Sequence, residues 1–453
     1  MQSSNAPLFD TEFTRNFEIN FTEPILHSPI YFEAYNGLQS INKQKRIIER
    51  IPYEKINEKK MKSIIKNMNL VHPNITTMYE WYTDGMYVYF VHESCLEMDL
   101  AHFIGSKPLK EVQAAIIARQ VLLALNYCHN MKVICEGLNL SRIFFPSGYE
   151  ALKVKIANPE VATMIKQCAI GLLESTELPY YEAPEVFEGK ATTKSPVWSL
   201  GAITYRMVTG RNPFEGKNAS DVKADIIKGS VHFPQAIFGS RGECQDFISK
   251  LLTSADKRIT PEEALHHPWI VRNTAEYVHK ETNVSPAVIK SLVKFSNMEA
   301  IKRVILGFLV STLETKEVEA ATKAFTTLNK DGDGKLTKEE IKEGIKAFSV
   351  EEDLIEFLDK ADTDKTGYID YREFCKAALA TQIFTNKDKL ARGLSFLDKN
   401  KNGFIRSEKL LEALKPYNNI VPHDELKKLI ENIEINRDGK ISLKELQVIL
   451  KEK

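Results

Sequence analysis

The sequence predicts an α+β domain with a strand-rich start and a helical body, followed by an all-α domain of helix–loop–helix repeats. Residues 86–91 read Met-Tyr-Val-Tyr-Phe-Val, which is typical of a strand, whereas apolar positions in 111–129 and 197–207 recur at helical spacing. Near the carboxyl end, four glycines recur at intervals of about 33 to 36 residues, which indicates repeated units. These glycines are Gly334, Gly367, Gly403 and Gly439.

Length and composition exclude several classes of protein. A chain of 453 residues is long enough for two to three domains of roughly 150 residues each. Its 43% hydrophobic content excludes disorder throughout. The 61 basic and 61 acidic residues cancel, so we expect no nucleic-acid partner.

The sequence also bears on location. No apolar run approaches the roughly 18 residues of a membrane-spanning helix. Residue 2 is Gln2, which excludes N-myristoylation, so we expect no membrane anchor. The six cysteines are scattered and form no CxxC pair, as is typical of reduced thiols inside a cell. We therefore expect a cytoplasmic protein, with association with the cytoskeleton as the alternative.

Each repeated glycine lies in a polar loop and is followed two residues later by Leu or Ile. Helical patterns flank the first two loops, at 318–328, 338–348, 353–361 and 371–379. An EF-hand loop places oxygens at positions 1, 3, 5, 7, 9 and 12, with Gly at position 6 for the turn. We interpret the four units as EF-hands, because the glycine and the polar positions agree in all of them.

The first two loops keep the oxygen atoms that a calcium ion requires. Asn329 replaces the usual Asp at position 1 of the first loop, which keeps an oxygen but loses a charge, so weakened binding is expected. The second loop is complete, with a hydroxyl from Thr366. The expected ligands are Asn329, Asp331, Asp333, Lys335 (backbone), Thr337 and Glu340, and then Asp362, Asp364, Thr366, Tyr368 (backbone), Asp370 and Glu373.

The last two loops are weaker candidates. Lys409 occupies position 12 of the third loop, where a bidentate carboxylate belongs, and Arg406 adds a second cation, so we expect no calcium there. Glu434 at position 1 of the fourth loop is one methylene too long. The third loop comprises Asp398, Asn400, Asn402, Phe404, Arg406 and Lys409, and the fourth Glu434, Asn436, Asp438, Lys440, Ser442 and Glu445. The sequence thus predicts about two calcium ions, with a weak third site in the fourth loop.

A single amphipathic helix is predicted over 286–313, with basic residues Lys290, Lys294, Lys302 and Arg303. Such a helix beside EF-hands is typical of a target that they bind. No methionine follows Met298, which argues against a Met-rich groove that repacks around many targets. We therefore expect this helix to be the intramolecular partner of the EF-hands. The alternative is an ordinary linker helix.

Several motifs of the first part resemble those of protein kinases. They are Pro179-Tyr-Tyr-Glu-Ala-Pro-Glu185, Val197-Trp-Ser-Leu-Gly201, Gly210-Arg-Asn-Pro-Phe214, the segment from Arg258 to Ile270, and His72-Pro-Asn-Ile75. With the EF-hands, the chain resembles a calcium-dependent protein kinase of the calmodulin-domain type. The resemblance implies an N-terminal extension (1–16), a two-lobed serine/threonine kinase-like domain (17–270), a junction with a regulatory helix (271–313) and a calmodulin-like domain (314–453).

The positions that would bind ATP depart from the family. Residues 21–35, where the Gly-rich phosphate loop belongs, contain no glycine. Glu49 falls where the family has its phosphate-pairing Lys, and a carboxylate there would repel a triphosphate. Arg50 is no substitute, because strand alternation directs it to the opposite face. The αC Glu position falls on Ser63 or Lys62; with Lys62, a charge-reversed pair with Glu49 is expected.

The positions that would carry out phosphate transfer are also changed. In the segment from Cys135 to Arg142, Gly137 replaces the catalytic base, Asn139 the Lys, and Arg142 the magnesium-binding Asn. Asn158 replaces the metal-binding Asp of the next motif. We therefore expect no catalytic residues and neither ATP nor Mg²⁺ as a cofactor.

Residues that support the kinase fold remain. Glu185 and Arg258 match the buried ion pair of the family, and Trp198, Gly201, Pro213, Phe214 and Trp269 match packing positions. The sequence therefore predicts a calcium-binding pseudokinase that acts as a scaffold, with an unknown protein partner on its kinase-like domain. The alternatives are a weak or atypical calcium-dependent serine/threonine kinase, and a structural component of a larger assembly such as the cytoskeleton.

Overall fold

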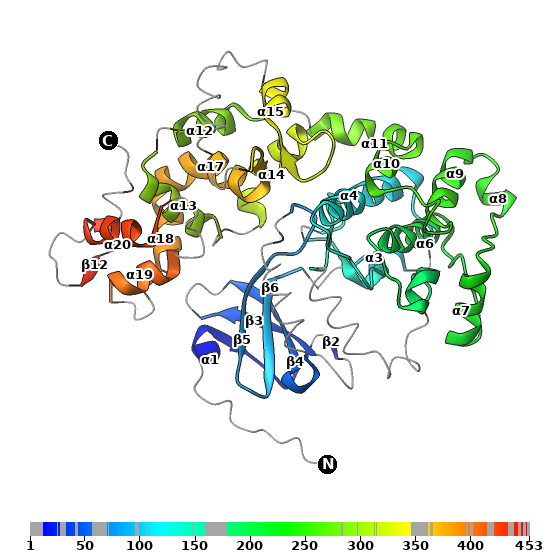
Figure 1. Ribbon diagram of the computed structural model, residues 1–453, viewed down its shortest axis with the longest axis horizontal. Helices are drawn as coiled ribbons and strands as arrows, with labels where there is room; N and C mark the ends of the chain where they lie inside the picture. Colours follow the sequence, from blue (N-terminus) through cyan, green and yellow to red (C-terminus); the bar gives the residue numbers. More distant parts are fainter. Residues whose placement is uncertain are drawn as a thin grey trace. The chain divides into compact units, whose positions relative to one another are not determined.

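The chain forms two compact units, residues 1–279 with Asp331–Gly334, and residues 280–330 with 335–453 (Figure 1). The computed structural model describes residues 12–24, 26–27, 33–40, 44–56, 70, 72–95, 99–105, 107–146, 148–158, 179–281, 284–296, 298–311, 313, 315–345, 361–362, 366–395, 397–398, 402–414, 421–433, 439–442, 445–446 and 450. The division falls inside a helix, α11 (Pro268–Glu281).

The first unit begins with an antiparallel sheet in the order β1-β3-β4-β6-β5, with β2 paired to β3. Its strands are β1 (Phe17–Ile19), β2 (Leu26–His27), β3 (Glu33–Gln39), β4 (Lys45–Pro52), β5 (Met78–Thr83) and β6 (Tyr87–Glu93). A short helix, α1 (Glu12–Asn16), packs Phe13 against Phe17, Ile48 and Tyr89. The last residues of the segment 1–16 are therefore part of the folded domain.

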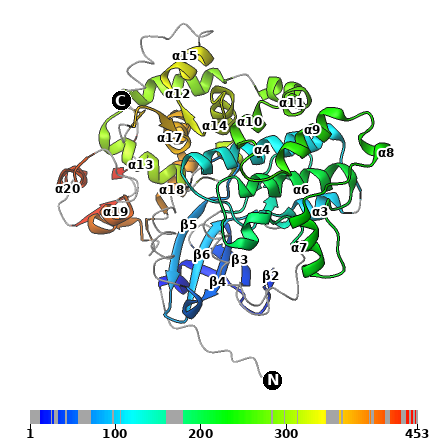
Figure 2. The ribbon, with the colours of Figure 1, turned by 45° about the vertical axis from the view of Figure 1, so that its right-hand side comes forward.

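The helical body follows the sheet. Its helices are α3 (Leu100–Ile104), α4 (Glu111–Asn130), α6 (Ser195–Thr209), α7 (Ala219–Lys228), α8 (Gln235–Phe238), α9 (Gly242–Leu251), α10 (Pro261–Leu265) and α11. Figure 2 shows α4, α6 and α9 side by side. Helices α4 and α6 are apolar around most of their circumference because they form the centre of the core. Gly201 is required there, since a Cβ atom would lie 2.8 Å from Cβ of Leu251.

The second unit contains the repeats. Its elements are α12 (Pro286–Ser296), α13 (Ala300–Ser311), α14 (Thr315–Leu328), β9 (Lys335–Leu336), α15 (Lys338–Ile345), β10 (Ile369–Asp370), α17 (Tyr371–Thr385), α18 (Lys387–Ser395), β11 (Phe404–Arg406), α19 (Ser407–Leu414), α20 (His423–Glu431) and β12 (Lys440–Ser442). The loops pair two by two, with Leu336 opposite Ile369 and Ile405 opposite Ile441. The expected helix over 353–361 lies almost entirely outside the described residues.

The single helix predicted over 286–313 is wrong: two helices, α12 and α13, occupy this segment. Helix α12 ends at Ser296 and α13 begins at Ala300. The sequence has Ser296 followed by Asn297 at this point, and Ser and Asn disfavour helix interiors because their side chains compete for backbone hydrogen bonds. Both helices still contribute to the core of the second unit, for example through Leu292 and Ile305.

Two further observations concern location. Among the helices of the described part, none combines the length and apolar character needed to cross a bilayer. The described cysteines are free and buried, and Cys168 lies outside the described residues.

Candidate functional site

The EF-hand loops have the predicted turn at position 6. The backbone φ angle is +82° at Gly334, +85° at Gly367, +81° at Gly403 and +75° at Gly439. Only glycine adopts this left-handed region without a steric cost, so the turn explains the residue at all four positions. The fold of the loops thus matches the spacing read from the sequence.

The first loop has its ligand side chains close to the loop backbone. Glu340 Oε2 accepts hydrogen bonds from Thr337 N (2.9 Å) and Thr337 Oγ1 (2.9 Å). The Asp331 carboxylate accepts one from Asp333 N (3.0 Å). Asn329 donates from Nδ2 to Lys335 O (3.1 Å), while its Oδ1, the expected position-1 ligand atom, is buried without a hydrogen-bond partner in the described part of the chain. This acceptor fits a cation in the loop.

The second loop is held in the same way. Asp362 at position 1 accepts hydrogen bonds from Thr366 N (2.9 Å) and Gly367 N (2.7 Å). Asp370 and Glu373 form a capping box at the start of α17, which fixes the position-12 carboxylate. Lys335 and Tyr368, both at position 7, lie side by side, with Lys335 Nζ 4.0 Å from the ring centroid. Asp364 lies outside the described residues.

The third loop folds like the second, although it lacks the position-12 carboxylate. Asp398 accepts from Asn402 N (3.1 Å) and Gly403 N (2.6 Å). In the fourth loop, Glu445 accepts from Ser442 N (2.7 Å). Asn400, Glu434, Asn436 and Asp438 lie outside the described residues, whereas Phe404, Arg406, Lys409 and Lys440 are described in β11, α19 and β12.

Within the ranges that the structure describes, no group of three or more His, Cys, Asp or Glu side chains is arranged around a common point. The donor atoms of the first two loops nevertheless fit calcium, because they supply carboxylate, amide, hydroxyl and backbone oxygens at EF-hand spacing. Calcium, when bound, would supply a hard positive charge that draws these oxygens together.

The junction helices pack on the EF-hand helices. Helix α12 contacts α17 and α14, and α13 contacts α17, α18, α19 and α20. Ser291 on α12 donates from Oγ to Ala377 O (2.9 Å) and accepts from Thr381 N (3.0 Å), both on α17. Because Ser291 is buried, these bonds fix the position of α12 on α17.

Glu49, which is expected at the position of the family's phosphate-pairing Lys, lies in β4 and points toward β6. Its Oε2 atom is 3.2 Å from His92 Nε2, and its side chain is 13% exposed. Arg50 engages other groups, as strand alternation predicts: Nε donates to Glu33 Oε2 (2.9 Å), and the guanidinium lies 4.6 Å from the Tyr87 ring centroid. Ser63 and Lys62 lie outside the described residues.

His92 and Arg142 both act on the Glu49 carboxyl. Burial alone would raise its pKa, but the facing His92 and the positive charge of Arg142 outweigh burial, and the pKa lies below its ordinary value. Glu49 therefore stays ionised at neutral pH.

The loop that carries Gly137 is held by apolar packing and by its backbone. Leu138 and Leu140 are buried, and Gly137 has a φ of +71°. Asn139 Oδ1 is buried without a hydrogen-bond partner in the described part of the chain. Arg142 O accepts from Ala157 N (2.9 Å), which ties the loop to the segment before Asn158.

Asn158, which is expected at the family's metal-ligand position, is buried, and its backbone N–H donates to Thr76 Oγ1 (2.9 Å). Its side chain is a neutral amide, where the expected alignment has a carboxylate in the family.

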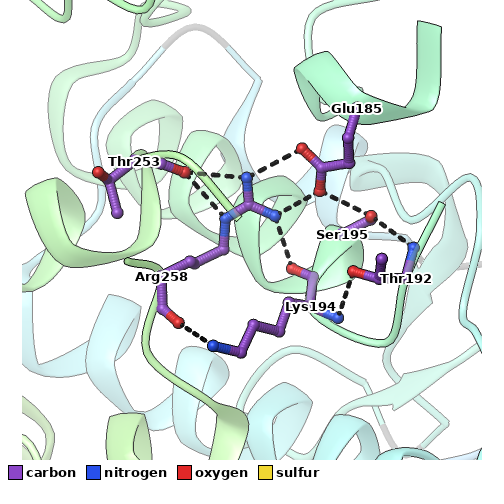
Figure 3. Close-up of polar contacts among 6 residues, drawn as sticks. All are labelled: Glu185, Thr192, Lys194, Ser195, Thr253 and Arg258. Carbon is purple, nitrogen blue, oxygen red and sulfur yellow. Dashed lines mark hydrogen bonds and ion pairs between the residues drawn. The ribbon is translucent and has the colours of Figure 1, made fainter. Parts of the chain in front are cut away.

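Glu185 and Arg258 form the ion pair expected from the sequence (Figure 3). Arg258 is fully buried, and its Nη1 and Nη2 atoms lie 2.6 and 3.2 Å from the two oxygens of Glu185. It also donates to the carbonyl oxygens of Lys194 and Thr253, while Ser195 Oγ donates to Glu185. The pKa of Glu185, which burial would raise, is held below its usual value by these donors. The pair thus joins the segment around Glu185 to the loop that precedes α10.

Comparison with known proteins identifies the fold. A family model described as the protein kinase domain matches residues 33–270. The chain belongs to the protein kinase family. On the C-terminal side of the kinase domain in the sequence, a model described as an EF-hand domain pair matches residues 318–379 and 387–450.

Two relatives match most of the chain. Calcium-dependent protein kinase 5 of Plasmodium berghei (strain Anka) is 28% identical over 87% of this chain and 72% of its own length. Calcium-dependent protein kinase 14 of Arabidopsis thaliana is 27% identical over 84% of this chain and 72% of its own length. A crystal structure of Rad53 1–466 in complex with AMP-PNP matches with a TM-score of 0.50 and 25% identity, over 57% of this chain and 66% of that chain.

His92 is the residue of the kinase domain that sequence reasoning missed. Glu49 lies opposite Phe90 in the register between β4 and β6, so His92, two residues further along, is its diagonal neighbour on the same face. Aligning the two strands in the sequence would have exposed the pair, but the register is set by contacts that the sequence alone does not display.

Proposed function

We propose that this chain is a calcium-sensing regulatory protein whose kinase domain transfers no phosphate and serves as a binding surface. The observation that carries the proposal is the buried Glu49 carboxylate at the position where the family binds phosphate through a Lys.

Charge at this position argues against a nucleotide. A like charge at about 4 Å costs about 4 kcal/mol at an effective dielectric constant of about 20. His92 and Arg142 hold Glu49 in its ionised form, so the repulsion persists at neutral pH. Segment 21–35 offers no glycine to let the backbone approach phosphates closely.

Gly137 argues against transfer even from a bound nucleotide. Glycine has no side chain to accept the proton of a substrate hydroxyl, and loss of a general base costs about 10²- to 10⁴-fold in rate. Asn158 keeps an oxygen but loses a negative charge that the family offers to magnesium, and Arg142 puts a cation in place of an oxygen ligand. The change at Gly137 affects removal of the substrate proton, whereas the changes at Asn158 and Arg142 affect magnesium binding.

The EF-hand unit supports the calcium half of the proposal. The first two loops keep their oxygen donors, and α12 rests on α17, the helix that begins at Asp370 and Glu373 of the second loop. A shift of the Glu373 carboxylate toward an ion would move the start of α17 and hence the surface that holds α12. Calcium binding is thereby coupled to the junction.

A weak calcium-dependent serine/threonine kinase is the second candidate, favoured by the names of the relatives, which are calcium-dependent protein kinases. A structural component of a larger assembly is the third. Nucleotide-dependent thermal stabilisation would favour the second candidate, and isolation in a stable stoichiometric complex would favour the third.

The deciding experiment is calorimetry of calcium and of Mg-ATP binding on the same sample of the full chain, together with transfer of radiolabelled phosphate to a protein substrate. We expect heat from calcium, none from Mg-ATP, and no transfer. Phosphate transfer that disappears in Asn158→Ala or Arg142→Ala would overturn the proposal, because those residues lie at the nucleotide-handling positions.

A further inference from the structure

A groove of about 570 Å³ lies on the helical body of the kinase domain, at the end of α6 and along the segment 211–217. It is far in sequence from both the EF-hands and the degenerate catalytic positions, so the function proposed above does not use it. Its volume is within the range of about 300 to 1,000 Å³ typical of ligand-binding clefts.

Positive charge dominates the groove. Arg206, Arg211 and Lys217 line it, and Glu215 is the single carboxylate among the lining residues. Within the described chain, none of the three cations forms an ion pair. Other exposed cations of the domain do so: Lys190 with Glu188, and Lys250 with Asp246. In a chain of zero net charge, this clustering leaves a local positive potential.

The groove is built on fixed elements. Arg206 donates to the carbonyl oxygens of Gly210 and Gly105, which orient its guanidinium without neutralising it. Gly216 allows the segment to lie against α7, since a Cβ atom there would be 2.5 Å from Val222 N. Preorganised charges lose less conformational entropy when a ligand binds.

Two aspartates of α7 accept hydrogen bonds from the backbone of the segment 211–217. Asp221 accepts a hydrogen bond from Lys217 N (3.2 Å), and Asp225 accepts one from Glu215 N (3.2 Å). Their carboxylates are engaged with backbone N–H groups and are not among the lining residues, so the lining itself stays cationic.

The rest of the lining favours a peptide over a small anion. Tyr180 and Asn212 add neutral polar side chains of the kind that exchange hydrogen bonds with a peptide backbone. An extended acidic segment meets several of the cations at once, whereas one small inorganic anion fills only part of a groove of about 570 Å³.

We propose that this groove binds an acidic peptide segment of a partner protein. The proposal rests on the function proposed above, because it supplies the partner surface of a kinase domain without catalysis. Asp and Glu side chains of the segment pair with Arg206, Arg211 and Lys217.

The test uses the full chain and a fluorescent ten-residue peptide with Glu at alternate positions, beside a twin peptide with Gln at those positions. Anisotropy titrations are run with and without calcium, and inorganic phosphate is added as a competitor. We expect the Glu peptide to bind and the Gln peptide to bind at least about fivefold more weakly, since exposed ion pairs each contribute modestly. Added salt should weaken binding.

Variants locate the binding. Arg211→Gln with Lys217→Gln should weaken the Glu peptide about fivefold, and Glu215→Gln should tighten it about twofold. The matched control is Lys228→Gln with Lys257→Gln, which removes the same charge from two exposed lysines outside the groove lining and should leave the affinity unchanged.

Equal binding of the two peptides in both calcium conditions, or an equal loss in the control variant, would overturn the groove proposal. Inorganic phosphate that displaces the Glu peptide with an affinity equal to that of the peptide would indicate a simple anion site. That result would also overturn the groove proposal. Phosphate transfer measured on the same samples would reject the proposed function separately, so the two failures are distinguishable.

Discussion

Replacing Arg258 with methionine is expected to destabilise the kinase domain by about 3 to 5 kcal/mol, because removing one partner of a buried ion pair leaves the other uncompensated. The Arg258 side chain is 0% exposed and that of Glu185 is 13% exposed. The substitution would also leave the carbonyl oxygens of Lys194 and Thr253 without this donor. For a unit of this size, the loss corresponds to a fall of about 6 to 20 °C in Tm.

Tryptophan fluorescence is the suitable assay. All three tryptophans of the chain, Trp81, Trp198 and Trp269, lie in the first unit, so their emission reports unfolding of the kinase domain alone. Urea titrations of the full chain would give the change in unfolding free energy, and calcium calorimetry on the same variant should be unchanged.

The matched control is Lys190→Met, which breaks an ion pair whose side chains are 75% and 63% exposed. Such a pair contributes at most about 1 kcal/mol. The reasoning is refuted when Arg258→Met shifts the midpoint no more than Lys190→Met does.

Three further predictions concern the calcium loops, the loop that carries Gly137, and pH. Glu340→Gln with Glu373→Gln should abolish the calcium heat, and persistent heat would mean that other loops bind the ion. Gly137→Ala should cost about 1 kcal/mol of kinase-domain stability because φ is +71° there, whereas Gly242→Ala, with open space around it, should cost nothing measurable by the same urea titration. Burial, with Lys155 nearby, lowers the pKa of His72 from 6.5 to about 3. The unfolded chain takes up a proton below pH 6.5 that the folded chain refuses, so the His72 contribution to stability is complete above pH 6.5 and falls by up to about 1.4 kcal/mol per pH unit toward pH 3. His72→Gln should flatten this part of the pH profile, and an unchanged slope would contradict the assignment.

The sequence predicted the fold class well because kinase motifs and EF-hand spacing are both local patterns. Glu185 and Arg258 could be paired in advance, since the two motifs that carry them resemble the family closely. The alternating faces of Glu49 and Arg50 also followed from strand geometry. These features depend on residue type and spacing alone.

What escaped prediction depends on tertiary contacts. The break between α12 and α13 was missed because the apolar spacing continues through Met298, although Ser296 and Asn297 disfavour a helix interior. The pairing of Glu49 with His92 required the register of β4 and β6. The charged groove forms because the segment 211–217 folds back beside Arg206. No periodic pattern in the sequence predicts this proximity.

The two halves of the junction rest on unequal supports. Helix α12 contacts α14 and α17 of the EF-hand pair with intact donors, whereas α13 contacts α17 of that pair and also α18, α19 and α20. Calcium at the pair with intact donors would therefore act on both junction helices through α17, while α19 and α20 hold α13 by an additional contact. A response driven by one such pair has a Hill coefficient of at most about two, so the chain would grade its output over a broad calcium range instead of switching abruptly.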